Sequence, residues 1–163
     1  MVEPERQPTY RQLASDMTHA CYSMYRASPL GLAPDTVDVD PATGVMTPHF
    51  LIYLQRPEVA ESLFYMYRLT GDGKYREQAW EIFQAIEKHT KMAVGYSGLH
   101  NAMEVPPSPD DLQQSWFLSE TLKYLWLIFS PPSALPLNEW VLNTEAHPLR
   151  VAATPARAGA LVA

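Results

Sequence analysis

The sequence predicts an all-α fold, and three observations lead to this expectation. Apolar residues recur three and four positions apart over long stretches, which is the period of one helical face. The 15 prolines among 163 residues fall mainly between these stretches and indicate helices joined by stiff loops. Residues 61–65 (Glu-Ser-Leu-Phe-Tyr) recur as residues 120–124 (Glu-Thr-Leu-Lys-Tyr). Such a repeat is typical of an α-solenoid or an α/α barrel, and chance similarity of two amphipathic helices is the alternative.

The first predicted helix covers about residues 9–25. Tyr10, Leu13 and Met17 begin an apolar stripe with helical spacing, and Pro29 follows the end of the helix. The next segment, from residue 30 to about 48, carries several prolines and a glycine among scattered acidic residues. We expect an ordered loop there.

A helical hairpin is predicted in the middle of the chain. The second helix begins near Pro57, because a proline in the first turn loses no hydrogen bond, and it ends before Gly71, a residue suited to a left-handed cap. Asp72 then caps a third helix from residue 74 to about 90.

The C-terminal third is expected to hold a fourth helix over residues 112–129 and a strand over residues 138–145. Pro148 forces the residue before it into an extended conformation. Residues 152–163 are rich in alanine and proline and predict a flexible tail. The length is that of one domain covering residues 1–163.

The composition excludes several classes of protein. With 12 basic and 18 acidic residues, the formal charge of −6 argues against a nucleic-acid-binding or anionic-membrane surface. We expect no transmembrane segment, because no apolar run is long enough, and no secretory signal in the polar first residues. The single cysteine, Cys21, excludes an internal disulfide and a cysteine-based zinc site.

Two pairs of residues are candidates for carboxylate chemistry. Glu58 and Glu61 share a face at the start of a helix, where acids more commonly complement the helix dipole. Trp116 and Glu120 lie four residues apart, so the ring and the carboxylate share a face that suits a sugar. Simple helix packing explains the second pair equally well. The repeat favours the sugar interpretation, because it places Glu61 and Glu120 at equivalent positions.

Residues 143–148 (Asn-Thr-Glu-Ala-His-Pro) follow the predicted strand and are polar or turn-forming. Thr144 offers a hydroxyl and a carbonyl oxygen, both hard ligands that suit Ca²⁺, whereas an ordinary surface turn is the alternative. No glycine-rich phosphate loop, nucleophile elbow or His/Cys metal motif is present in the sequence. The residues therefore favour carboxylate chemistry.

Five sequence blocks carry a resemblance to a known family. They are residues 31–34 (Gly-Leu-Ala-Pro), 56–62 (Arg-Pro-Glu-Val-Ala-Glu-Ser), 117–124 (Phe-Leu-Ser-Glu-Thr-Leu-Lys-Tyr), 129–130 (Phe-Ser) and 143–149 (Asn-Thr-Glu-Ala-His-Pro-Leu). In this order they resemble the C-terminal part of the class I α-1,2-mannosidases, glycoside hydrolase family 47. The resemblance extends over residues 10–151, but only over about the last third of the family's catalytic domain.

The resemblance implies a fold and an incomplete barrel. The family forms an (α/α)₇ barrel plugged by a C-terminal β-hairpin, and this chain holds only part of that barrel. Helices built for a barrel are then expected to expose apolar flanks, at Val59, Leu63, Phe64 and along residues 122–129. The general acid and a second essential acid of the family belong to an upstream portion that this sequence does not contain.

The resemblance also assigns roles to particular residues. Glu58 matches the general base of an inverting hydrolysis, and Thr144 matches the direct ligand of a Ca²⁺ cofactor. Carboxylates that hold the water shell of the calcium ion are matched by Glu61, Glu120 and Glu145. Positions that contact the sugar are matched by Arg56, Trp116 (usually phenylalanine), Asp35, and again Glu61 and Glu120.

Three features depart from the family pattern or are incomplete. Asp35 stands where the family has a glutamate, so this carboxylate reaches less far into its subsite. Gln55 stands where a leucine is expected. Cys21 matches one half of the family's disulfide, whose other half belongs to the upstream portion.

The expected function is that of a mannosyl-oligosaccharide 1,2-α-mannosidase, with high-mannose N-glycans as the substrate and no nucleic-acid partner. The resemblance places such enzymes in the endoplasmic reticulum or Golgi, or outside the cell. The chain alone is expected to be an inactive fragment. A non-catalytic, lectin-like relative and a helical remnant without function are the alternatives.

Overall fold

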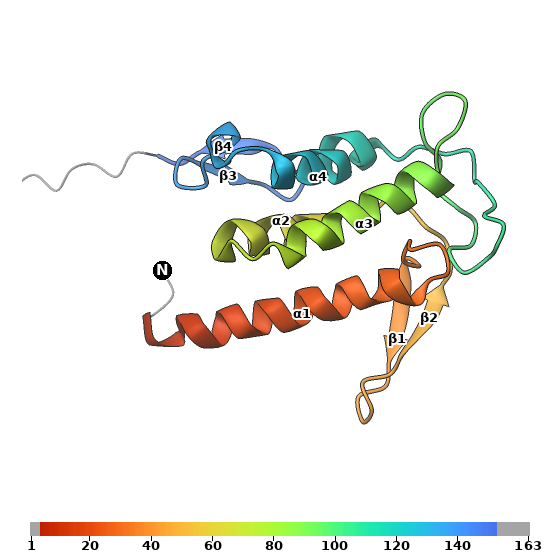
Figure 1. Ribbon diagram of the computed structural model, residues 1–163, viewed down its shortest axis with the longest axis horizontal. Coiled ribbons are helices and arrows are strands. Elements are labelled where there is room, and N and C mark those ends of the chain that lie inside the picture. The colour runs from red at the N-terminus through yellow and green to blue at the C-terminus, as the bar shows by residue number, and fades with distance from the viewer. Residues whose placement is uncertain (1–3, 153–163) are drawn as a thin grey trace, which may run out of the picture.

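The fold is taken from a computed structural model that describes residues 4–152. The chain is mostly helical and forms tiers, with α1 on one side, α2 and α3 in the middle and α4 on the other side (Figure 1). Apart from Ala152, the tail predicted to be flexible lies outside the described residues. In chain order the elements are a 3₁₀ turn (Pro4–Arg6), α1 (Gln7–Ala27), β1 (Thr36–Val39), β2 (Met46–Phe50), α2 (Glu58–Thr70), α3 (Lys74–His89), a π-helical turn (Phe117–Thr121), α4 (Leu122–Phe129), a 3₁₀ turn (Pro132–Ala134), β3 (Trp140–Leu142) and β4 (Pro148–Arg150).

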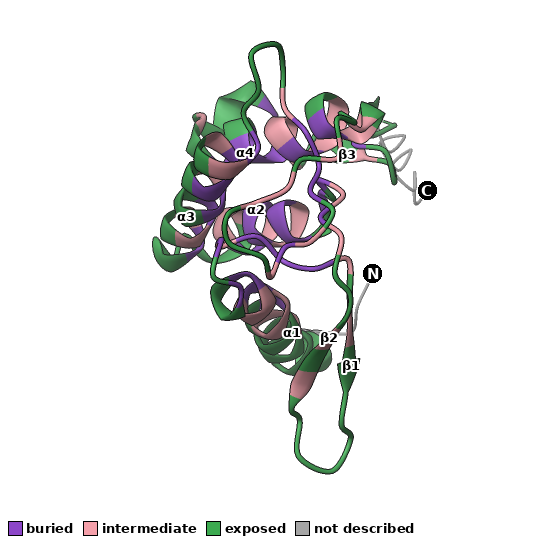
Figure 2. Ribbon diagram, turned by 90° about the vertical axis from the view of Figure 1, so that its right-hand side faces the viewer, coloured by how far each residue is buried: buried purple, intermediate pink, exposed green. Residues whose placement is uncertain are grey.

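The helix α1 confirms the first predicted helix, but only its C-terminal half is buried. Tyr22 and Tyr25 pack into the core, whereas Tyr10, Leu13 and Met17 are about half exposed. The N-terminal part of the predicted apolar stripe therefore remains largely uncovered by the rest of residues 4–152, and much of α1 is coloured as exposed in Figure 2.

The predicted helical hairpin is confirmed with nearly the expected boundaries. Pro57 precedes the first residue of α2, and Gly71 ends the helix in the left-handed conformation, with φ 72°. The Asp72 carboxylate accepts the N–H of Lys74 at 3.0 Å and so satisfies one free donor of α3. These local signals explain why the sequence predicts the two helices so closely.

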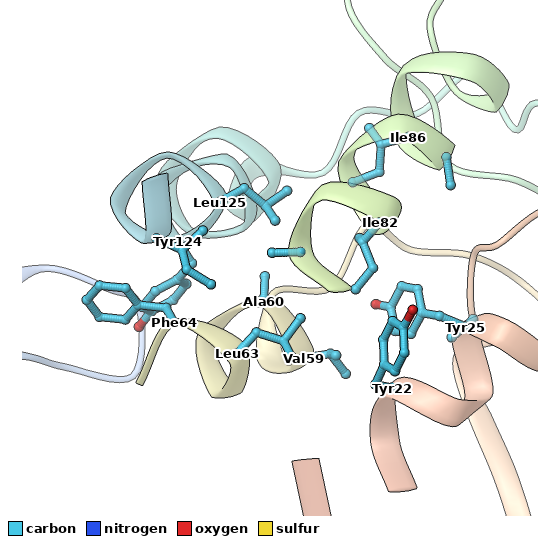
Figure 3. Close-up of a cluster of buried hydrophobic side chains, with 14 of the residues drawn as sticks. Tyr22, Tyr25, Val59, Ala60, Leu63, Phe64, Ile82, Ile86, Tyr124 and Leu125 are labelled. Carbon is cyan, nitrogen blue, oxygen red and sulfur yellow. The ribbon is translucent and has the colours of Figure 1, made fainter. Parts of the chain in front are cut away.

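The core lies around α2, which contacts α1, α3 and α4. Leu63 and Phe64 are fully buried, and Val59 is nearly so. The expectation that these three side chains are partly exposed is therefore wrong, because neighbouring helices already enclose α2. The labelled side chains that meet around it in Figure 3 are Tyr22, Tyr25, Ala60, Ile82, Ile86, Tyr124 and Leu125.

The fourth predicted helix begins three residues later than expected, at residue 115. Residues 112–114 instead bond to distant segments: the Leu112 carbonyl accepts the Gly98 N–H, and the Gln114 N–H donates to the Gln55 side chain. The first part of the helix is a π-helical turn, Phe117–Thr121, which continues into α4. Such turns occur frequently at functional sites.

The apolar flank predicted along residues 122–129 is confirmed at its outer side. Trp126 is 63% exposed, and Trp80 of α3 beside it is 49% exposed. Together with Phe83, Leu122, Leu125 and Phe129 they line a groove of about 450 Å³, which we call the α3–α4 groove.

Two small antiparallel hairpins accompany the helices. The β3–β4 hairpin confirms the expected C-terminal hairpin, although β3 ends at Leu142 because residues 143–147 form its turn. The β1–β2 hairpin corrects the expected loop over residues 30–48 (Figure 1). Within residues 4–152, no helix has both the length and the hydropathy that crossing a bilayer requires.

Candidate active site

Three carboxylates lie close enough to a fourth, that of Glu120, for their charges to act on it, and the four come from three separate elements. Glu58 and Glu61 lie in the first turn of α2, Glu120 lies in the π-helical turn, and Glu145 lies in the β3–β4 turn. Burial raises the pKa of Glu120, and the negative charges of Glu58, Glu145 and Glu61 raise that pKa further. The structure therefore brings together the four glutamates that the sequence analysis singled out.

Tyr124 helps to fix one of these carboxylates. Its hydroxyl donates to Glu61 Oε1 at 3.2 Å, and its ring packs 5.7 Å from that of Phe64, measured between centroids. Burial, followed by the charge of Glu61, raises the pKa of Tyr124. Tyr124 therefore stays a neutral hydrogen-bond donor to Glu61 at ordinary pH.

Arg56, Asp35 and Trp116 form a second group next to Glu58. Arg56 Nε donates to Asp35 Oδ1 at 2.5 Å, and this contact raises the pKa of Arg56. The Arg56 guanidinium carbon lies 5.7 Å from the centroid of the Trp116 ring. The Trp116 indole N–H donates to the Leu54 carbonyl at 2.9 Å, which fixes the plane of the ring. Asp35 therefore contacts Arg56 despite being one methylene shorter than glutamate.

A cavity of about 300 Å³ opens beside this second group. Asp35, Arg56 and Glu58 contribute charged groups to its lining, and Tyr25 and Cys21 of α1 also line it. Cys21 carries a free thiol and is partly exposed. The cavity is therefore lined both by groups that bond hydroxyls and by apolar and aromatic groups, which suits a carbohydrate ring.

Gln55 joins the segment before α2 to the start of the fourth helix. It is fully buried, its φ is 58°, and its backbone carbonyl accepts the Thr121 hydroxyl at 2.6 Å. Its side-chain oxygen accepts the Gln114 N–H at 3.0 Å, whereas its side-chain nitrogen has no partner among the described residues. Sequence analysis noted Gln55 only as a departure; the polar residue at an apolar position was the available signal.

Thr144 lies in the β3–β4 turn with its oxygens available. The residue is exposed, and neither its hydroxyl nor its carbonyl oxygen accepts a hydrogen bond from another described residue. The turn is attached to α4 by Lys123, whose ammonium donates to the Ala146 carbonyl at 2.8 Å. Sequence reasoning missed Lys123 and Tyr124 as parts of the site, because both contacts join residues far apart in the chain.

The donor set fits a hard cation that keeps most of its water. Among residues 4–152, no three His, Cys, Asp or Glu side chains are placed to ligate one ion directly. Thr144 supplies two hard oxygens, and the neighbouring carboxylates supply negative charge and acceptors for water. Calcium accepts 6–8 oxygen ligands, waters included, and so suits this arrangement.

Comparison with known proteins decides the family. Residues 2–151 match the description of glycosyl hydrolase family 47. The chain belongs to this family. The resemblance expected from the five sequence blocks is thereby confirmed, and family 47 is a family of glycoside hydrolases.

Several family 47 proteins align with most of the chain. Mannosyl-oligosaccharide alpha-1,2-mannosidase IA of Drosophila melanogaster is 45% identical over 144 residues, which are 87% of this chain and 22% of the relative. Mannosyl-oligosaccharide 1,2-alpha-mannosidase IB of Homo sapiens is 42% identical over the same shares. The chain thus spans about a fifth of the length of these curated relatives.

A solved mannosidase structure has a similar fold. The alpha-1,2-mannosidase from Trichoderma reesei superposes with a TM-score of 0.78 at 30% sequence identity. The superposition covers 83% of this chain and 33% of that protein. Most of this chain therefore shares the fold of one part of that mannosidase.

Proposed function

We propose that this chain is the C-terminal part of the catalytic domain of a mannosyl-oligosaccharide 1,2-α-mannosidase, which hydrolyses α-1,2-linked mannose from high-mannose N-glycans. One observation carries the proposal: Glu58, Glu61, Glu120 and Glu145 lie together beside the Arg56–Trp116 pair. The names of the family 47 relatives supply the substrate class.

The sugar is held by Trp116, Arg56 and Asp35. The Trp116 ring offers an apolar face to the C–H groups of a mannose ring, and its fixed indole N–H keeps that face in place. Arg56 donates to sugar hydroxyls from a guanidinium already oriented by Asp35. A preoriented binding group lowers the entropy lost when the sugar binds. Glu61 and Glu120 accept hydrogen bonds from further hydroxyls.

Glu58 acts as the general base. Its carboxylate takes a proton from water while the water oxygen attacks the anomeric carbon and the glycosidic bond breaks, so the configuration inverts. In inverting glycosidases the acid and base carboxyl groups lie ~6.5–9.5 Å apart, which leaves room for that water. The acid that protonates the leaving oxygen belongs to the upstream portion of the family 47 domain.

Calcium is the proposed cofactor, and Thr144 is its proposed direct ligand. Glu61, Glu120 and Glu145 hold the water shell of the ion through hydrogen bonds. The bound ion supplies a positive template that orients sugar hydroxyls and water. The free oxygens of Thr144 and the proximity of the three carboxylates support this assignment.

The complete protein is proposed to form the (α/α)₇ barrel of the family, with the β3–β4 hairpin reaching its axis. The mostly helical fold and the match to part of the Trichoderma reesei mannosidase support this. We also propose a site of action along the secretory pathway, in the endoplasmic reticulum or Golgi, or outside the cell, since that is where family 47 N-glycan trimming is expected.

The test is a glycan-trimming assay on the 163-residue chain and on a version extended upstream to the length of its relatives. The extended protein is expected to release mannose from an α-1,2-linked oligosaccharide, and the short chain is expected to release none. Loss of a general acid or base typically lowers the rate by ~10²–10⁴-fold, so Glu58→Gln should lower that of the extended protein to this extent. Full activity of Glu58→Gln would contradict the assigned base. Glycan binding by the extended protein without hydrolysis would support the lectin-like alternative.

A further inference from the structure

The β3–β4 turn, residues 143–147, keeps its shape through its own hydrogen bonds. The Asn143 side-chain oxygen accepts the N–H groups of Glu145 at 3.0 Å and His147 at 2.8 Å. The Asn143 N–H also donates to the His147 carbonyl, and the Ala146 N–H donates to the Asn143 carbonyl. These bonds lie inside the turn, so they fix its shape but not its position relative to α4.

Within residues 4–152, one hydrogen bond joins this turn to another element. The Lys123 ammonium on α4 donates to the Ala146 carbonyl at 2.8 Å. Ala146 is fully buried, whereas its neighbours Glu145 and His147 are exposed, and its φ of 56° lies in the left-handed region. A non-glycine residue keeps that conformation only where its surroundings hold it. The contact with Lys123 supplies such a restraint.

Lys123 is also close to the carboxylates. It follows Glu120 by three residues on the same helical stretch and lies near enough for its charge to act on the Glu120 carboxylate. Its positive charge opposes the repulsion that raises the pKa of Glu120. The same ammonium therefore balances part of the negative charge of the site and holds the turn that carries Thr144.

We propose that Lys123 is a positioning residue: its ammonium anchors the β3–β4 turn to α4 and thereby places the oxygens of Thr144 beside the carboxylates. This inference rests on the proposed function, because the calcium role of Thr144 gives the placement its purpose. Lys123 acts through the Ala146 carbonyl and touches neither the metal nor the substrate.

The first experiment measures the anchor itself, without calcium. Hydrogen exchange of the 163-residue chain is compared with that of Lys123→Met, which keeps an apolar stem, and Lys123→Arg, which keeps a cationic donor. Lys91→Met is the matched control, since Lys91 is exposed and its ammonium donates to Glu87 on α3, away from the β3–β4 turn. Turn amides in Lys123→Met should exchange about tenfold faster, the effect of losing a hydrogen bond to a charged group. The Lys123→Arg and Lys91→Met variants should resemble the unmodified chain.

Two outcomes of this experiment overturn the inference. Unchanged exchange of the turn in Lys123→Met would show that the turn needs no anchor. Equal acceleration across α2 and the turn would show that Lys123 contributes only to general stability. Faster exchange confined to the β3–β4 hairpin supports the inference.

The second experiment links the anchor to the metal by calorimetric titration with CaCl₂. Lys123→Met should weaken calcium binding by about tenfold or more, as is usual for residues that orient metal ligands, and Lys123→Arg should restore most of it. Unchanged affinity in Lys123→Met, together with loss of binding in Thr144→Ala, would overturn the inference and leave the proposed function intact. Unchanged affinity in Thr144→Ala would instead contradict the proposed calcium site, and the exchange experiment would still decide whether Lys123 holds the turn.

Discussion

Replacing Gln55 by leucine should raise the stability of the chain, although Gln55 makes a hydrogen bond. The side chain is fully buried, its oxygen accepts the Gln114 N–H, and its nitrogen has no partner among the described residues. Leucine has a similar volume and keeps the left-handed backbone as strained as glutamine does, so the strain cancels in the comparison. The change in unfolding free energy therefore depends on the side-chain oxygen, which accepts a hydrogen bond, and on the side-chain nitrogen, which has no partner among the described residues.

The magnitudes favour the leucine variant. The lost hydrogen bond contributes about 0.5–1.5 kcal/mol, whereas the buried unsatisfied amide costs about 1–3 kcal/mol. Gln114 is only partly buried, so water replaces the acceptor for its N–H. The expected net gain is about 1 kcal/mol of unfolding free energy, which raises the melting temperature by ~2–4 °C for a chain of this size.

Thermal and urea unfolding followed by circular dichroism measure this change. Gln55→Ala is the control, because it removes the same amide but leaves a cavity, and it should lower the melting temperature. A melting temperature of Gln55→Leu equal to or below that of the unmodified chain would refute the reasoning, since a gain of about 1 kcal/mol should raise it by ~2–4 °C. It would mean that the amide nitrogen is satisfied, for example by a buried water.

Three further predictions follow from the core, the carboxylates and the exposed flank. Phe64→Ala should lower the unfolding free energy by about 3–5 kcal/mol, because Phe64 is fully buried, and a loss below 1 kcal/mol in urea unfolding would contradict its place in the core. Because the pKa of Glu120 is raised, the folded state binds a proton at this carboxylate more tightly than the unfolded state does. Lowering the pH from about 7 toward 4.5, the ordinary pKa of a glutamate side chain, should therefore stabilise the unmodified chain more than it stabilises Glu120→Gln. Parallel pH dependence of the two proteins in EDTA would refute this. Trp80 and Trp126 are exposed in the α3–α4 groove, so the chain should self-associate in ultracentrifugation. Trp126→Lys should shift the chain toward monomer. Equal association of the unmodified chain and Trp126→Lys would exclude the groove as the contact between copies.

The parts of the fold that depend on local signals could be predicted from the sequence. The ends of α2 and α3 are set by Pro57, Gly71 and Asp72, which act on backbone groups next to them in the chain. The local sequence is therefore sufficient to predict these helix ends. The β1–β2 hairpin is missing from the prediction because its strands are short and none of their residues is fully buried, while the prolines and the glycine of this segment favour a loop.

The site could be predicted only in part, for a related reason. Glu58, Glu61 and Glu120 were found from helical spacing and the internal repeat, and Thr144 from its oxygen donors, before the resemblance assigned their roles. The contacts that arrange them join distant residues: Lys123 with Ala146, and Gln55 with Thr121. Such pairings have no local pattern, because they depend on how α2, α4 and the β3–β4 turn pack together.

The position of Cys21 provides a single site for thiol labelling at the candidate active site. It is the single cysteine of the chain, its thiol is free, and it lines the same cavity as Arg56 and Glu58. A thiol-reactive dye therefore attaches at one place, in the cavity whose lining suits a carbohydrate ring. Protection of that thiol against the dye then measures occupancy of the cavity directly, without any turnover of substrate.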